Sequence, residues 1–190
     1  IGLVSLSKTT SKDMDLQMNH CQNYGTLNSC SSSEITFVGG LIGEAKFARP
    51  HSTVIIENCE GAGNIKSLVD ISSAGGIIGI VDFDYNYQDH LSENGVISNK
   101  VKITSLTANQ HLTVDCKECT VGGVIGTISS GYPYQPNEIS VSIIGYQDII
   151  VECNKCTVGG IIGTVTDGVH ASVSIIDTTM NGLVSVTSKI

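Results

Sequence analysis

The feature that most constrains this chain is a glycine run that recurs four times within 190 residues. It stands as VGGLIG at 38–43, AGGIIG at 74–79, VGGVIG at 121–126 and VGGIIG at 158–163. The first glycines of the runs are 36, 47 and 37 residues apart. A motif that returns at this spacing is typical of a repeat protein, in which each unit packs mainly on its neighbours.

Between the runs, β-branched residues alternate with other residues at a period of two. The pattern is clearest in STVIIENC at 52–59, NKVKITSL at 99–106, ISVSIIGY at 139–146 and ASVSIIDT at 171–178. Such alternation predicts strands, and no segment shows a convincing helical period. We therefore expect an all-β fold, namely a β-solenoid of about four to five coils with 36–47-residue repeats. A β-propeller is the rival, but its blades are usually rich in aromatic residues and this chain has no Trp.

The glycine pairs are expected to form corners of the coils. These pairs are Gly39 and Gly40, Gly75 and Gly76, Gly122 and Gly123, and Gly159 and Gly160. Glycine at a corner permits a tight turn or lets another backbone come close. The two aliphatic residues after each pair should stack in ladders, with at least one of them facing the core. The matching pieces QNYGTL at 22–27 and EGAGNI at 60–65 predict turns in which glycine supplies a positive φ.

Both ends of the sequence cut through a repeat. IGLVSL at the start matches the tail of the glycine run, so residues 1–2 form a partial repeat, and VSVTSKI stops shortly before the next glycine pair is due. Solenoids normally finish with polar caps, which are not visible here. We expect residues 1–190 to be a single repeat region from a longer chain, or a subunit whose ends stack on neighbours.

The recurring V-G-G-[LIV]-[IV]-G runs, preceded by NxC and xGxI pieces, resemble GLUG-type repeats over the whole chain. Such repeats occur in large secreted and surface proteins of bacteria and some protists, including adhesins. The resemblance implies a secreted or cell-surface β-solenoid stalk or adhesive region with no catalysis of its own. Its expected partners are neighbouring repeats or subunits joined end to end, with a glycan or a host or cell-surface protein as a candidate ligand.

Seven cysteines agree with an oxidising compartment. Cys116 and Cys119, and likewise Cys153 and Cys156, form Cys-x-x-Cys pairs directly before the last two glycine runs. A disulfide inside each pair is favoured, because a duplicated unit with its own pair is self-sufficient. The alternatives are the cross-coil bridges Cys116–Cys153 and Cys119–Cys156, a four-cysteine zinc site, or reduced thiols.

The remaining cysteines are less regular. Cys21 and Cys59 occupy matching positions 38 residues apart and could form a cross-coil bridge. Alternatively, Cys21 pairs with Cys30, which leaves Cys59 without a partner.

The 47-residue unit contains an expected insertion at 82–95. Asp82, Asp84, Asn86 and Glu93 occupy positions 1, 3, 5 and 12 of a calcium-loop pattern. Simple alternation explains the segment more economically, with apolar residues on one face and carboxylates on the other. Calcium is therefore a candidate ligand, and no other cofactor is predicted.

The charge and the absence of catalytic motifs narrow the range of possible functions. The net charge of −8 and the single arginine, Arg49, give no basic stripe, so nucleic acid is not an expected partner. No apolar run approaches the ~18 residues of a membrane helix. No catalytic residues are predicted, because no nucleophile-elbow, zinc-protease or P-loop motif is present. We expect a structural or adhesive extracellular module giving a rigid stalk, surface display or fibre assembly. The alternative is a polysaccharide-acting β-helix lyase or hydrolase with a charged ladder along a groove.

Overall fold

The computed structural model describes residues 3–6, 15–30, 36–47, 52–68, 71–83, 99–130, 137–166 and 171–188. Every regular element within these ranges is a β-strand, and the strands stack in parallel as a β-solenoid of about four turns. The predicted fold class is therefore confirmed. Within the described ranges, none of the structure is a helix long and apolar enough to cross a membrane.

The strands follow one another coil by coil. The first is β1 (Leu3–Leu6). Coil 1 contains β2 (Asp15–Asn19), β3 (Gln22–Asn23), β4 (Leu27–Cys30), β5 (Thr36–Gly39) and β6 (Ile42–Phe47). Coil 2 contains β7 (Thr53–Glu57), β8 (Glu60–Gly61), β9 (Ile65–Leu68), β10 (Ile71–Gly75) and β11 (Ile78–Phe83). Coil 3 contains β12 (Lys100–Gly122) and β13 (Ile125–Ser130), and coil 4 contains β14 (Asn137–Gly159) and β15 (Ile162–Val165). Coil 5 contains β16 (Ala171–Ile175), β17 (Thr179–Asn181) and β18 (Val184–Ser188).

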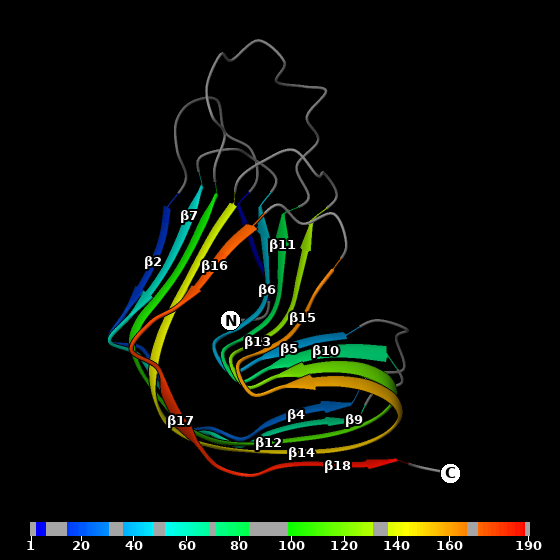
Figure 1. Ribbon diagram of the computed structural model, residues 1–190. Coiled ribbons are helices and arrows are strands. Elements are labelled where there is room, and N and C mark those ends of the chain that lie inside the picture. Colours follow the sequence, from blue (N-terminus) through cyan, green and yellow to red (C-terminus); the bar gives the residue numbers. More distant parts are fainter. Residues whose placement is uncertain are drawn as a thin grey trace.

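Each coil has an L-shaped outline when seen along the stack (Figure 1). The front wall holds β2, β7, β16 and the first parts of β12 and β14, and it turns at an outer corner into the base wall. The base wall holds β4, β9, β18 and the middle of β12 and β14, and it ends at a corner that we call the toe. From the toe, β5, β10 and the ends of β12 and β14 run back as the inner wall. The glycine runs then form an elbow, from which β6, β11, β13 and β15 leave as the return wall (Figure 1).

The coils stack residue on residue. Gly39 pairs with Gly75, Gly75 with Gly122, and Gly122 with Gly159, so the repeat seen in the sequence is the ladder seen in space. The ladder holds through the elbow, where the amide of each second glycine donates to a glycine carbonyl of the next coil at 3.1–3.2 Å. The glycine spacing in the sequence therefore fixes the register of the whole stack.

The buried apolar residues of the described chain group into two clusters, one in each arm of the L. The upright arm contains both aliphatics of the glycine runs, among them Ile77 and Ile78, and the rings of Phe47 and Phe83, whose centroids are 5.0 Å apart. The other arm lies between the base and inner walls and ends at the cysteines of the toe. The prediction that at least one aliphatic of each run faces the core is confirmed for coils 1 to 3, where both are buried.

The elbow glycines answer two different geometric demands. A Cβ on the first glycine, Gly122, would lie 1.8 Å from the carbonyl oxygen of Ile125, so this glycine makes the tight turn possible. A Cβ on the second glycine, Gly123, would lie 2.1 Å from the carbonyl oxygen of Gly160 in the next coil. Both predicted roles, a tight corner and a close backbone approach, are therefore present at successive positions.

The turns at 22–27 and 60–65 differ from their prediction. The positive φ values at the outer corner belong to His20, Asn58, Ser105 and Asp177, with φ of 48–54°. Gly63 is needed for space instead, because its Cβ would lie 1.9 Å from the carbonyl oxygen of Gly25. Coil 4 crosses this corner with one residue fewer, since the three-residue step from Ile103 to Leu106 faces a two-residue step from Val141 to Ile143.

The second glycines of coils 3 and 4, Gly123 and Gly160, provide a matched pair of positions for substitution. We expect Gly123→Ala to destabilise the fold by at least about 3 kcal/mol, because a peptide backbone must move to admit the methyl group. Gly160→Ala should change stability by less than about 0.5 kcal/mol, since nothing lies within 4 Å of its Cβ position. Denaturant unfolding of both variants measures the difference, and equal stability losses would contradict the close approach between coils.

Candidate functional site

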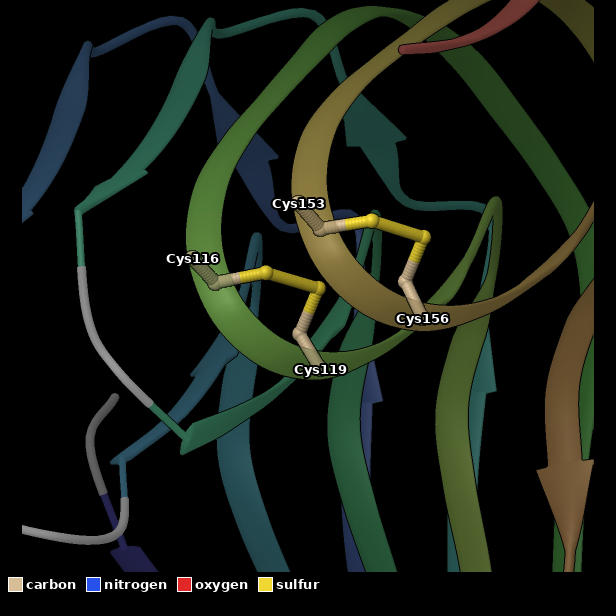
Figure 2. The surroundings of a disulfide bond; sticks show 4 residues. All are labelled: Cys116, Cys119, Cys153 and Cys156. Atoms are coloured by element: carbon tan, nitrogen blue, oxygen red, sulfur yellow. A yellow bond between two sulfur atoms is a disulfide. The ribbon is translucent and has the colours of Figure 1, made fainter. Parts of the chain in front are cut away.

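The toe carries a disulfide in each of two neighbouring coils. Cys116 bonds Cys119 in coil 3, and Cys153 bonds Cys156 in coil 4, with 6.2 Å between the Cα atoms in both. The two bonds lie one above the other inside the curve of the chain (Figure 2). In each pair, two outward residues separate two inward cysteines, so the bond closes the turn that joins the base wall to the inner wall. In the chain-entropy model, each four-residue loop is worth about 2 kcal/mol.

This arrangement selects one of the four interpretations of the cysteine pairs. The cross-coil bridges are absent, although Cys116 pairs with Cys153 and Cys119 with Cys156 in the ladder. Parallel partners hold their Cβ atoms about 4.8 Å apart and pointing the same way, which is wider than the ~3.5–4.5 Å of a disulfide. The sulfurs are also oxidised in pairs, so the four-cysteine zinc site and the reduced thiols are wrong.

Peptide mapping without reduction tests the connectivity. Trypsin alone is uninformative, because the peptide from Glu118 to Lys155 contains both Cys119 and Cys153. Adding a glutamate-specific protease separates all four cysteines. We expect 103–117 bonded to 119–138 and 153–155 bonded to 156–189, whereas cross-coil bridges would join 103–117 to 153–155.

Cys21 and Cys59 are free thiols on neighbouring coils. The bridge between them, and the bond from Cys21 to Cys30, are therefore absent from the structure. Instead, the Cys21 amide donates to the sulfur of Cys59 at 3.3 Å. Burial raises the pKa of the Cys59 thiol. The matching positions arise from the ladder, and the same Cβ spacing that disfavours bridges at the toe applies here.

Two buried glutamines, Gln110 and Gln147, separate the two apolar clusters at the elbow. They pair with each other in the ladder, are 1% and 4% exposed, and make no side-chain hydrogen bond within the described protein. Their amide groups pack on the glycine run, since a Cβ on Gly76 would lie 2.3 Å from Nε2 of Gln147 and 2.7 Å from Oε1 of Gln110. The one sign of this contact in the sequence is a glutamine at an inward position of the alternating pattern, which does not by itself predict it.

The candidate calcium site is only partly within the described residues. Asp82 lies in β11, where it accepts a hydrogen bond from the Ser129 hydroxyl at 2.7 Å and pairs with Lys46 at 3.6 Å. Asp84, Asn86 and Glu93 fall outside the described residues. Among the residues that are described, no three His, Cys, Asp or Glu side chains gather in a way that could hold a metal ion.

Charged side chains on the walls pair mainly between coils. Lys100 meets its ladder partner Glu138 at 3.0 Å, and Lys155 meets its ladder partner Glu118 at 2.6 Å. Asp115 and Glu152 are like-charged neighbours in the same ladder. Exposed pairs of this kind contribute about 0–1 kcal/mol each, so they add little to the stability of the fold. Their main effect is to favour the register in which opposite charges face each other.

Asp148 lies on the base wall and is held by residues of three coils. Its Oδ1 accepts the Leu183 amide of coil 5 at 2.9 Å, and its Oδ2 lies 3.1 Å from Nδ1 of His111 in coil 3. The hydrogen bond from Leu183 is the main cause that lowers the pKa of Asp148, and bonds from Tyr146 and His111 act in the same direction. One carboxylate thereby ties three coils together.

The lowered pKa of Asp148 predicts a pH-dependent contribution to stability. A depressed carboxyl pKa stabilises the fold above the unfolded value of about 3.9, and this gain is lost as the pH falls through the folded value. We expect Asp148→Asn to lower the melting temperature at pH 7, with the difference from the parent chain narrowing as the pH falls from about 5 toward about 2. His111→Gln removes only the contact between His111 and Asp148, so it should reproduce a small part of the effect. A difference that stays constant with pH would contradict the assignment.

No family model matches the chain, and neither a curated protein nor a solved structure shows a significant match to it.

Proposed function

We propose that this chain is a structural and adhesive module of the GLUG type, secreted or displayed at a cell surface, in which stacked coils give a rigid stalk or fibre. The observation that carries the proposal is the unbroken register of the elbow through coils 1 to 4, in which Gly39, Gly75, Gly122 and Gly159 form one ladder. A stack of this kind lengthens by one coil for each repeat without altering its cross-section.

The disulfides support an extracellular setting, because such bonds persist in oxidising compartments. They brace a corner, and their sulfurs pack in the buried apolar cluster of that arm. This placement suits a part that must keep its shape outside the cell.

Both ends of the described stack leave their interior open. On the coil 1 side, a cavity of about 560 Å³ is lined by Met18, Phe37 and the elbow glycines Gly39 and Gly40, among others. On the coil 5 side, residues that pair with buried positions of coil 4 are 37–51% exposed, namely Val173, Ile175, Val184 and Val186. Apolar surface of this kind favours a further coil, from the same protein or from a neighbouring subunit, as the expected partner.

An in-register tandem fusion tests the proposal. In the ladders, Ser188 pairs with Cys153, and Leu3 occupies the position of Thr164. Ten residues separate Cys153 from Thr164 in coil 4, and residues 189, 190, 1 and 2 supply four of them where two copies are joined. Six linker residues therefore restore the spacing of coil 4. The linker Ser-Thr-Val-Gly-Gly-Ile reproduces the elbow. We expect the fusion to melt at a higher temperature than the single chain and to scatter X-rays as one rod of doubled length, because the joined ends bury each other.

A fusion with a linker two residues shorter is the matched control, since it places the glycines out of register. It should melt like the single chain and scatter as two bodies joined flexibly. If both fusions behave alike, the coils do not continue in register and the stalk proposal is wrong.

A further inference from the structure

A column of outward-facing residues crosses the base wall near the outer corner, with one residue from each coil. Its members, which we call the tyrosine column, are Tyr24, Ala62, Asn109, Tyr146 and Asn181. Asn109 pairs with Tyr146 and Tyr146 with Asn181, while Tyr24 and Ala62 directly follow the paired residues Asn23 and Gly61. Tyr24 and Tyr146 are 60% and 48% exposed. Two aromatic rings therefore stand on one line parallel to the axis of the stack.

Each ring is tethered through its hydroxyl group. The Tyr24 hydroxyl donates to the carboxylate of Glu60 in coil 2, and the Tyr146 hydroxyl donates to Asp148. Asp148 is itself held by the Leu183 amide and by His111. A tethered ring has less side-chain freedom to lose when a ligand binds, so both rings are pre-organised.

The surroundings of the rings hold many hydrogen-bonding groups, together with two exposed aliphatic side chains on the columns beside Tyr146, namely Ile144 at 67% and Leu183 at 58% exposure. The exposed neighbours on the adjacent columns include Gln22, Thr26, Asn64, Thr107 and His111. Within the column, only Ala62 and Asn109 lie between the two rings. The rings are three coil steps apart, which is about 14 Å at the ~4.8 Å spacing of parallel strands.

We propose that the tyrosine column binds an uncharged polysaccharide strand that lies along the solenoid axis, with a sugar ring stacked on each tyrosine. This proposal rests on the adhesive role above and names its ligand class. An aromatic ring offers an apolar face to the C–H groups of a sugar, and amide, hydroxyl and imidazole groups beside it can bind the sugar hydroxyls. The separation of the rings suits a segment about three sugar units long.

Other ligands fit this surface less well. The net charge of −8 disfavours an acidic polysaccharide. A protein partner would favour a contiguous apolar core, whereas Ala62 and Asn109 divide the ring of Tyr24 from the apolar group that Tyr146 forms with Ile144 and Leu183. The assignment therefore points to a neutral glycan.

Titration calorimetry with neutral oligosaccharides tests the site. The probes are the hexaoses and disaccharides of the cello-, xylo- and manno- series. We expect at least one hexaose to bind about tenfold or more tightly than its disaccharide, because only the longer chain reaches both rings. Tyr24→Ala and Tyr146→Ala should each lower the hexaose affinity about tenfold, to near the disaccharide level, whereas Tyr146→Phe should stay within about threefold of the parent.

Leu68→Ala is the matched control. Leu68 is an exposed aliphatic side chain on the base wall away from the column, and its removal should leave binding unchanged. All variants are first compared by thermal melting, so that unfolding is not mistaken for lost binding.

The site assignment is overturned if no hexaose binds at about 10 mM, or if both alanine variants bind as the parent does. The tandem fusion reports on the stacking of coils without any sugar. A chain that forms the in-register rod but ignores every oligosaccharide would refute the tyrosine column alone, whereas failure of the rod would refute the stalk.

Discussion

The structure depends on backbone-to-backbone contact between coils at the elbow. The second glycine of each of the first three runs lies so close to the next coil that any side chain would collide with a carbonyl oxygen, as the 2.1 Å between the Gly123 Cβ position and the Gly160 oxygen shows. The hydrogen bonds on either side of this contact continue the ladders of the inner and return walls. A coil that shifted by one residue would bring a side chain into the gap. The elbow therefore fixes the register, and the register places every other ladder.

The same contact shapes the core. Because the elbow projects toward the outer corner, the interior is divided into two arms, and little room is left between them. Gln110 and Gln147 occupy this narrow place with amide groups beside glycine peptide groups. A buried polar group without a partner costs about 1–3 kcal/mol, so these residues do not maximise stability. A shift of register would move their amides against the aliphatic ladders, which is less favourable still, and the glutamines thus add to the specificity of the stack.

The sequence was sufficient to predict the structural features that recur from coil to coil. The spacing of Gly39, Gly75, Gly122 and Gly159 predicted the ladder, and the alternation of Val and Ile predicted the walls. It was insufficient for features that depend on how the arms of one coil meet. The positive φ at the outer corner falls on His20, Asn58 and Asp177, which are residue types enriched in such a backbone, but in coil 3 it falls on Ser105, and serine does not mark it. Two contacts can be predicted only when the cross-section is known. One is the contact of the buried glutamines with the glycine run across the core, and the other is the joining of three coils by the carboxylate of Asp148.

Covalent and non-covalent forces act in different directions in this molecule. A parallel in-register stack keeps equivalent Cβ atoms too far apart for good disulfides, so the bonds at Cys116–Cys119 and Cys153–Cys156 close corners within a coil. Cohesion along the axis then rests on hydrogen bonds, aliphatic ladders and charge pairs such as Lys100 with Glu138. Each of these interactions adds to stability only where another coil is stacked on the end. The outermost coil consequently carries the exposed apolar surface of the stack, as Val184 and Val186 do here, and stability along the axis grows with the number of coils.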